Sequence, residues 1–485
     1  MIPQKNLIDL ELSGLYGSKL LESLGRIIKL YDFYDGNGQH WQPASDLDYK
    51  PSQVIVNQAK KLIKREARFM FGRTPEFTIT SPGGDSNDDA IRDDVQSALD
   101  DILERSFFPD KLLGAARDCF IGGRVAIKLS GGIDTPVTVQ FRPAPEFVFF
   151  TEDDDCDKLR KIIFFYRTND CTNVAEQRIW KQKYEIQSGR CFLTEGVYDG
   201  YGSLIEGGET INTGLSFIPC KVIINDGLTG DMLGESDIAE LMDLQIAYNR
   251  LFSDDLDALR FNMFPQRVAV DADSTSLENM VISPGALVDL MTDPAMGDGG
   301  SQANLSMLEA HFSYSERFEA VMNRIKNDMH DLLSVPNVGL EQLKGLMQSG
   351  KSMKALYWEL IERCEEKWTV WEPALKWMCH SLLQMASIYS DAPELPDDYD
   401  IHIEHMYPIL EDDDIEREID MREVTAQVRS RASYIRKWNI ADDADSELLQ
   451  IKTEQTLLED SYSGALDMEL SQPPNITDED DEDAE

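Results

Sequence analysis

Two long amphipathic segments, separated by a turn-rich insert, constrain the fold of this chain more than any other feature. Glu235–Asn262 and Leu305–Ser334 both carry apolar residues at helical spacing. Pro265 ends the first segment, because proline cannot continue a helix. The insert holds two short stretches of strand composition, Arg267–Val270 and Ala286–Leu290. The pattern predicts a stalk of two long helices that carries a small β knob.

The residue pattern before the predicted stalk indicates an α+β domain. Between Gly122 and Cys220, short apolar runs alternate with Gly, Asn and Asp turns, which is typical of an antiparallel sheet. Helical spacing precedes it at Asp9–Tyr31, Ser52–Phe71, Asp89–Ser106 and Pro109–Ile121. The expected strands are Arg124–Leu129, Val137–Phe141, Phe147–Phe150, Lys161–Arg167, Gln177–Trp180, Tyr184–Gln187, Arg190–Thr194 and Leu215–Ile218.

The residue pattern after the predicted stalk indicates further helices and one strand. A long helix is expected over Met353–Ser390, whose aromatic residues are typical of core or interface packing (Tyr357, Trp358, Trp368, Trp371 and Trp377). A strand is expected at Ile401–Met406, and helices at Ile415–Trp438 and Asp443–Asp460. Thr477–Glu485 is almost entirely acidic, which predicts a solvated, disordered tail.

The charge of the chain limits its partners. A formal net charge of −43 argues against a protein that grips nucleic acid or anionic lipid by bulk attraction. It remains compatible with a surface past which DNA slides without sticking. The 7 cysteines form no C-x-x-C pair, which suits a reducing compartment. The sequence contains neither a signal peptide nor an apolar run of membrane-spanning length, so we expect a cytosolic, soluble chain.

One motif points to a different function. Gly345–Ser352 reads G-L-M-Q-S-G-K-S, a complete match to the phosphate-cradling loop of nucleotide hydrolases. That mechanism needs a buried strand running into the loop, yet Ser334–Lys344 has no β-branched apolar run. A magnesium-binding Asp after the loop is also missing. We therefore interpret the segment as a lysine-bearing loop between two long helices.

Other candidate sites have simpler interpretations. Asp153–Asp157 has carboxylate side chains at the spacing of a calcium-binding loop. Such a loop requires Gly and Glu at the positions that Lys158 and Phe164 occupy here. His402 and His405 fall on opposite faces of the expected strand, which disfavours a shared metal. A row of helical cations is expected to form ion pairs or subunit contacts in preference to DNA contacts: Lys60, Lys61, Lys64, Arg65 and Arg68.

The order of several short motifs resembles the portal proteins of tailed double-stranded DNA bacteriophages, the head-to-tail connector family. The first is Tyr31–Gly36 at the end of the first helix, and the second is Asn57 with a basic helix closing on Phe71–Pro75. The third is Gly234–Asp237, which opens the long helix containing Asp243, Tyr248 and Asn249. The fourth is Ser334-Val335-Pro336 followed by Ser349-Gly350 and Lys354; Lys351-Ser352 departs from the small apolar residues usual there.

The resemblance implies a portal-like ring subunit with a wing, a stem, a clip, a tunnel loop and a crown. The wing would comprise residues 1–233, with a long wing helix over 353–400. The stem would be 234–262 and 305–334, and the clip 263–304. The tunnel loop would be 335–352. Residues 401–465 would hold the last wing strand and the helical crown, and 466–485 the acidic tail.

The resemblance also implies function and partners. It implies a non-enzymatic dodecameric ring without cofactor or metal, assembled in the host bacterial cytoplasm at the capsid portal vertex of the virion. DNA would be packaged and ejected through it. Its partners would be the terminase large subunit, the major capsid and scaffolding proteins, a head-completion adaptor and transient double-stranded DNA, with no membrane. Two alternatives remain open: a P-loop NTPase that uses Gly345–Ser352, and an acidic scaffold or adaptor without a channel.

The residues themselves support a ring. An apolar stripe on each stalk helix cannot be buried by one partner helix alone, whereas neighbouring copies in a closed ring would cover it. The expected packing residues are Ile238, Leu241, Tyr248, Phe252, Phe312, Phe318 and Ile325. The expected residues of the DNA channel and tunnel loop are Lys344, Gly345, Ser349, Gly350, Lys351 and Lys354.

Overall fold

The computed structural model confirms the α+β class, with helices and antiparallel strands in one chain. By compactness the chain divides into two units. The first comprises Met1–Gln342 and Ala355–Pro408, and the second Leu343–Lys354 and Ile409–Glu485. The residues described are 15–42, 49–80, 86–228, 230–263, 266–270, 304–308, 315–338, 350–390, 392–396, 398–409, 413–438 and 446–454.

The first unit opens with four helices, all near the expected positions. They are α2 (Leu15–Asp35), α3 (Gln58–Phe71), α4 (Ser86–Arg105) and α5 (Phe108–Gly122). The helix expected from Ser52 begins only at Gln58, where the Asn57 side chain accepts a hydrogen bond from Lys60 N–H (2.9 Å). Asn57 thereby caps the helix, as short polar side chains commonly do. Residues 52–57 are extended, so the prediction was wrong over this segment.

Two antiparallel sheets follow these helices. A five-stranded sheet has the order β4-β5-β6-β7-β8, and a three-stranded sheet has the order β3-β2-β9. Three expected strands differ from the structure: Gln177–Trp180 and Tyr184–Gln187 fall within or beside the single strand β6, and Leu215–Ile218 is no strand. The strands are β2 (Arg124–Gly132), β3 (Thr135–Pro143), β4 (Phe147–Thr151), β5 (Leu159–Arg167), β6 (Ile179–Gln187), β7 (Arg190–Tyr198), β8 (Leu204–Asn212) and β9 (Cys220–Ile224).

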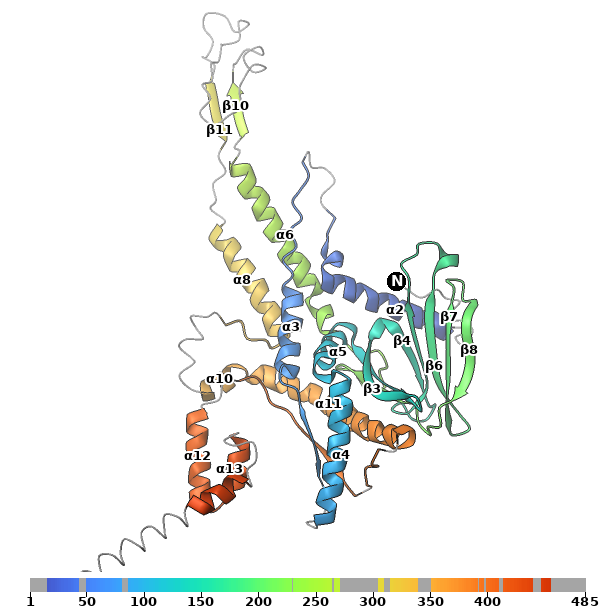
Figure 1. Ribbon diagram of the computed structural model, residues 1–485. Coiled ribbons are helices and arrows are strands. Elements are labelled where there is room, and N and C mark those ends of the chain that lie inside the picture. The colour runs from blue at the N-terminus through green and yellow to red at the C-terminus, as the bar shows by residue number, and fades with distance from the viewer. Residues whose placement is uncertain are drawn as a thin grey trace, which may run out of the picture. The chain divides into compact units, whose positions relative to one another are not determined.

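The predicted stalk is present as two long helices that pack together, α6 (Asp237–Met263) and α8 (Ser315–Leu332) (Figure 1). Between them in sequence, β10 (Gln266–Val270) pairs with β11 (Asn304–Leu308). The expectation that Leu305 already begins the second helix was therefore wrong. The spacing of Leu305 and Leu308 is compatible with a helix or with a strand. The segment forms a strand because it pairs with β10. Ala286–Leu290 and Phe312 lie outside the described residues.

A third long helix, α11 (Trp358–Ser390), packs against β9 and carries much of the core. It is preceded by α10 (Gly350–Leu356), so the helix expected from Met353 is interrupted at Tyr357. Trp368 and Trp371 are buried against Phe71, with ring centroids 5.2 and 4.8 Å apart. The strand β12 (Asp400–Glu404) pairs with β1 (Glu76–Thr80), which links the two ends of the first unit.

The second unit contains α12 (Asp413–Thr425), α13 (Arg431–Lys437) and a helical segment over residues 446–454. The helix expected over Ile415–Trp438 is thus broken. Gln427 adopts a positive φ of 60°, and Ser430 caps α13 by accepting from Ser433 N–H. Asp420 holds the two helices together through Lys437 Nζ (2.8 Å) and the Trp438 indole N–H (2.9 Å).

Two further findings concern the whole described chain. Among the helices that the structure describes, none is both long and apolar enough to cross a membrane. The cysteines are free thiols, and Cys119, Cys191, Cys220, Cys364 and Cys379 are buried.

Candidate functional site

The long helix α6 presents a row of polar side chains on its packed face. Gln245, Asn249, Ser253 and Asp257 recur every fourth residue, so they lie on one side of the helix. All of them are buried. Buried polar groups need hydrogen-bond partners, and here the partners come from the extended segment 52–59 that precedes and opens α3.

Backbone N–H groups of this segment donate to the α6 side chains in order. Ser52 N–H donates to Asp257 Oδ2 (2.8 Å), Val54 N–H to Ser253 Oγ (3.0 Å) and Val56 N–H to Asn249 Oδ1 (3.0 Å). Ala59 N–H then donates to Gln245 Oε1 (2.8 Å). The segment therefore runs antiparallel to α6, and the helix side chains take the place of a neighbouring strand. We call this arrangement the polar ladder.

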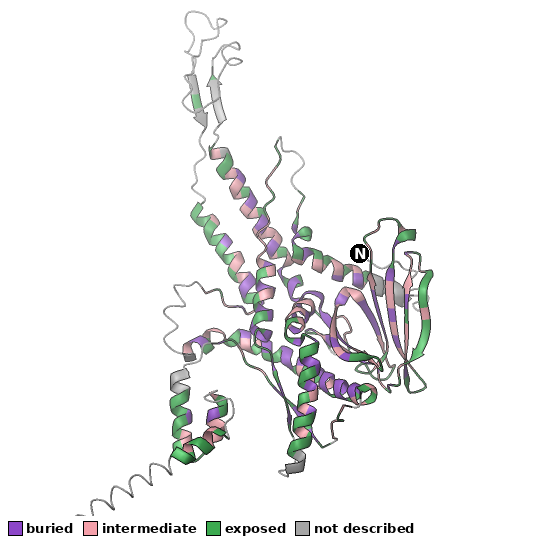
Figure 2. Cartoon of the chain, in the orientation of Figure 1, coloured by how far each residue is buried: buried purple, intermediate pink, exposed green. Residues whose placement is uncertain are grey.

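The polar ladder changes the interpretation of the stem stripe. Of the expected packing residues of α6, Ile238 and Leu241 are fully buried, whereas Tyr248 and Phe252 are half-buried with stacked rings 6.5 Å apart. The polar residues between them were not expected to lie on the packed face. On α8, Phe318 and Ile325 are half-buried, and Val321 and Leu332 on the same helix are exposed by 46% and 43%. Buried and exposed residues alternate along both helices (Figure 2).

The start of α6 depends on the motif Gly234–Asp237. Gly234 has a φ of +70°, and a Cβ there would lie 2.0 Å from the Gly123 carbonyl oxygen, so only glycine fits. The Ser236 hydroxyl donates to the Ile121 carbonyl (2.6 Å). Asp237, the first residue of α6, is buried among cations.

These cations belong to a buried ion network that joins α3, α6 and α11. Asp237 accepts from Lys367 Nζ (3.0 Å) and from an Arg363 guanidinium nitrogen (2.8 Å). Glu66 of α3 accepts from Arg363 Nε (2.9 Å). Asn225 accepts from Lys367 Nζ (2.7 Å) and donates to Asp237 (3.1 Å). We call these residues, together with Asp226 beside Lys367 (3.4 Å), the junction network.

Electrostatic interactions within the junction network are strong because Glu66, Asp237 and Lys367 are buried. Burial raises the pKa of Glu66, and the neighbouring Asp237 raises it further, while Lys367 and Arg363 lower it. Burial alone would lower the pKa of Lys367, but Asp237 and Glu66 outweigh burial and raise it. A buried pair of this kind adds little net stability, yet loss of one partner leaves an uncompensated buried charge. The network therefore fixes how the stem helix leaves the rest of the unit.

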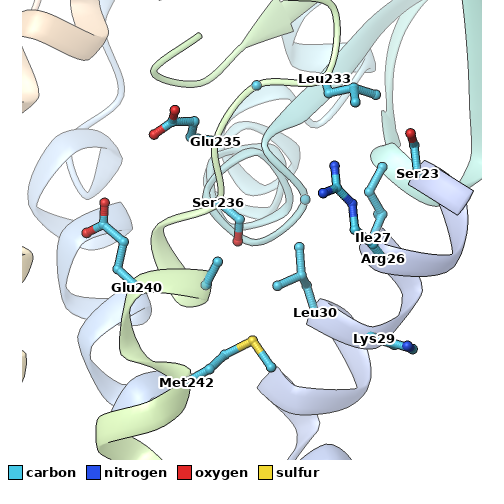
Figure 3. A pocket seen from close by; sticks show the side chains of 13 residues that line it. Ser23, Arg26, Ile27, Lys29, Leu30, Leu233, Glu235, Ser236, Glu240 and Met242 are labelled. Carbon is cyan, nitrogen blue, oxygen red and sulfur yellow. The ribbon is translucent and has the colours of Figure 1, made fainter. Parts of the chain in front are cut away.

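A groove lies beside this junction, between α2 and the beginning of α6 (Figure 3). Its volume is about 440 Å³. Ile27 and Leu30 of α2 line one wall, and Glu235, Glu240 and Met242 line the other. The lining is mostly apolar with carboxylates at one side, and it brings together no arrangement of nucleophile and base.

The predicted tunnel-loop residues are only partly described. Lys344, Gly345 and Ser349 lie outside the described residues. Gly350, Lys351 and Lys354 are in α10, so the end of the expected loop 335–352 is helical instead. Before the motif, residues 333–338 follow the end of α8 and form no strand. The buried strand that a phosphate-cradling loop requires is therefore missing from the described part of this segment.

Other sequence-predicted sites have structural partners. Lys60 pairs with Asp35 (3.0 Å) and lies over the Tyr34 ring, which agrees with ion pairing for this member of the basic row. His402 lies in β12 opposite Thr78, while His405 bonds to Glu365 (3.1 Å) and stacks on Trp368. In the described part of the chain, no His, Cys, Asp and Glu side chains are grouped to hold a metal ion.

Several residues of the site were not predicted from sequence. Glu66, Arg363 and Lys367 have the spacing of ordinary helical charges, and Asp237 was expected only as part of the motif Gly234–Asp237 that opens the long helix. One available signal was that Glu66 lies among apolar positions of α3, where a charge needs a partner.

Comparison with known families identifies the class of protein. A family model described as phage portal protein, SPP1 Gp6-like, matches residues 18–457. The chain belongs to this family of phage portal proteins. The family is structural rather than enzymatic, and its members are capsid-associated oligomeric rings at a vertex of the virion. No curated protein matches the chain.

Proposed function

We propose that this chain forms the ring through which phage DNA enters and leaves the capsid. In this proposal α6 and α8 form the stem, and β10 with β11 belongs to the clip. Residues 1–233 and α11 form the wing together with β12, and the C-terminal helices up to residue 465 form the crown. The family match over residues 18–457 supports the assignment, because it covers most of each of these parts.

The half-covered stem is the observation that carries the proposal. Ile325 of α8 remains half-buried, and Val321 and Leu332 remain exposed, although α8 packs on α6. Burying apolar surface contributes roughly 25 cal/mol per Å². A contact in which a neighbouring copy covers this stripe would therefore be stabilised. Repetition of that contact around a closed ring leaves no stripe uncovered.

The charge of the chain supports a conduit for DNA. With a net charge of −43, a channel through a ring of copies would be lined or flanked by acidic surface. Such a surface repels phosphates and avoids the tight, salt-sensitive binding that cationic surfaces give. DNA could therefore move along the axis in both directions without being held.

Docking partners follow from this role. We assign the clip to contacts with the terminase large subunit during packaging and with a head-completion adaptor afterwards. The wing would contact the major capsid and scaffolding proteins. The first assignment is tested by a pull-down of the terminase large subunit with a chain in which residues 266–308 are replaced, and retained terminase binding would contradict it. The second is tested by a pull-down of the capsid and scaffolding proteins with a chain in which β8 is replaced.

We also propose that the segment between α8 and α10, together with the first turn of α10, contacts DNA in the channel through Lys344 and Lys351. Loops contribute little to a core, so this segment can be shortened without unfolding the helices on either side. Removing residues 339–348 should preserve rings and reduce the DNA packaged per capsid. Normal packaging by shortened rings would exclude the loop from the mechanism.

The decisive experiment for the proposed function is the native mass of purified protein, with negative-stain images of the same sample. We expect a particle many times the 54.9 kDa chain mass, dodecameric by the family resemblance, with an axial hole. The capsid and scaffolding proteins should be co-expressed as a second condition. A monomer under both conditions, or a compact particle without a hole, would contradict the proposal and favour an adaptor without a channel.

A further inference from the structure

The cations on and beside α3 differ in whether they form ion pairs with described residues. Lys60 pairs with Asp35, whereas the ion pairs among the described residues include none made by Lys61, Arg65, Arg68 or Lys326. Lys61, Arg65 and Arg68 are exposed on α3, and Lys326 of α8 is half-buried. We call these four residues the cationic face.

The members of the cationic face repel each other. Burial lowers the pKa of Lys61, and the charges of Arg65 and Lys326 lower it further. The chain has 89 Asp and Glu against 46 Lys and Arg, yet these four cations form no ion pair with an acidic residue that the structure describes. The like-charge cluster has an electrostatic cost in the isolated chain, and an acidic partner would remove that cost.

An acidic surface lies on α6. Asp243 and Asp254 are exposed on α6 and separated by about three helical turns, so they share a face. Glu240 is exposed beside them, and Arg250 is the described cation on the same face. We call Glu240, Asp243 and Asp254 the acidic face.

The two faces point away from each other within one chain. Asp243 is two residues from both Leu241 and Gln245, which places it about 200° around the helix from that buried side. The buried side holds the start of α3, since Ala59 N–H bonds to Gln245. The cationic face of α3 and the acidic face therefore lie on opposite sides of α6, where they cannot pair with each other.

We propose that the cationic face of one copy docks against the acidic face of the next copy, as a head-to-tail contact between subunits. This inference rests on the proposed ring, because opposite faces of one chain that complement each other generate a closed series of identical contacts. Charge complementarity fixes which sides meet and favours encounter in the correct orientation. The partner is a second copy of this chain, and DNA contact by the cationic face is the competing outcome.

The test uses two charge-reversed chains. Variant A carries Lys61→Glu and Arg65→Glu, and variant B carries Asp243→Lys and Asp254→Lys. Each variant alone places like charges at every subunit contact, so we expect its ring fraction at micromolar concentration to fall at least about tenfold. The matched control, Lys158→Glu with Arg178→Glu, reverses two exposed cations of the five-stranded-sheet region and should form rings like the unaltered protein.

Mixing A and B supplies the decisive measurement. In an alternating ring, the reversed cationic face of A meets the reversed acidic face of B, and the two unaltered faces also meet. We therefore expect equal amounts of A and B to restore rings with a 1:1 composition by native mass spectrometry. Alternation closes only with an even number of copies, which the proposed dodecamer provides.

The outcomes separate the inference from the ring itself. If the unaltered protein forms no ring, the proposed function fails and the inference fails with it. If the unaltered protein forms rings and A or B forms them equally well, the ring stands and the proposed contact is wrong. Absence of rings in the mixture also overturns it. Normal rings of A with reduced DNA packaging would assign the cationic face to DNA.

Discussion

At the scale of single residues, the carboxylates at the base of α6 depend on the cations of α11. Lys367→Met would leave Asp237 and Glu66 with Arg363 as their remaining close cation, in a site without water. Breaking a buried pair costs about 3–5 kcal/mol, so we expect a loss of this order in the free energy of unfolding by urea. Lys376→Met on the same helix removes a partly exposed pair with Glu372 and should cost less than about 1 kcal/mol. Equal losses would mean that the junction network is not a special constraint.

A second residue-scale prediction concerns pH. Burial raises the pKa of Asp118 from 3.8 to about 6; Glu146 raises it, whereas the Tyr31 hydroxyl (3.0 Å) and Arg117 lower it. The unfolded chain ionises first as pH rises from about 4 to 6, so the folded state loses stability over this range. Asp118→Asn keeps the Tyr31 hydrogen bond and should raise stability at pH 7 by about 1–3 kcal/mol.

The measurement is the urea midpoint of unfolding between pH 3.5 and 8, compared with the exposed control Asp134→Asn. The gain from Asp118→Asn should vanish near pH 3.5, where the carboxyl group is protonated in both states. A gain that is independent of pH would show that charge at Asp118 is not the cause.

At the scale of elements, the polar ladder can be opened at one position. Asn249→Leu removes the acceptor of Val56 N–H and the partners of Gln245 and Gln39. Leaving buried polar groups unpaired costs about 1–3 kcal/mol each, so destabilisation by about 2 kcal/mol or more is expected. Hydrogen exchange of the amides of residues 52–56 should accelerate more than that of α11. Arg250→Leu, an exposed change one residue away, should leave both quantities near their original values.

The elements also show what sequence reasoning could reach. The helices α2, α4 and α5 were predicted because their apolar spacing is local. Ser52–Asn57 was assigned wrongly because its N–H groups are bound by α6, almost two hundred positions later. The strand β8 was missed because Gly207 and Gly208 interrupt its pattern, and β11 because a short apolar run fits two periods.

The local sequence pattern predicted less of the candidate site than of the helices and strands. The expected stem residues Ile238 and Leu241 are buried, but the polar ladder and the junction network required knowledge of which helices meet. A buried Glu66 and an exposed Arg65 look alike in a row of helical charges. The motif Gly234–Asp237 carried the resemblance, and the structure supplies its physical reason in a left-handed glycine and a buried carboxylate.

At the scale of the whole molecule, the alternative of a nucleotide hydrolase has a direct test. A ligand present at a hundred times its dissociation constant stabilises a protein by about 2.7 kcal/mol, which is readily seen as a thermal shift. We expect ATP with magnesium to produce no shift, and Lys351→Ala to leave the melting temperature nearly unchanged. A magnesium-dependent shift that Lys351→Ala abolishes would instead support a phosphate-binding role for Gly345–Ser352.

The polar ladder has a built-in limit of length. Two residues of an extended chain advance by about 6.7 Å, whereas four residues of a helix advance by about 6.0 Å. The mismatch accumulates, so a straight segment loses its partners after a few steps. Here the chain leaves the extended form after Val56, and the next bond is made by Ala59 within the first turn of α3. The rise of α6 thus limits how far the extended segment can keep its partners, and the Asn57 cap begins α3 within that limit. An insertion of one residue between Ser52 and Val56 is expected to shift the register of the ladder.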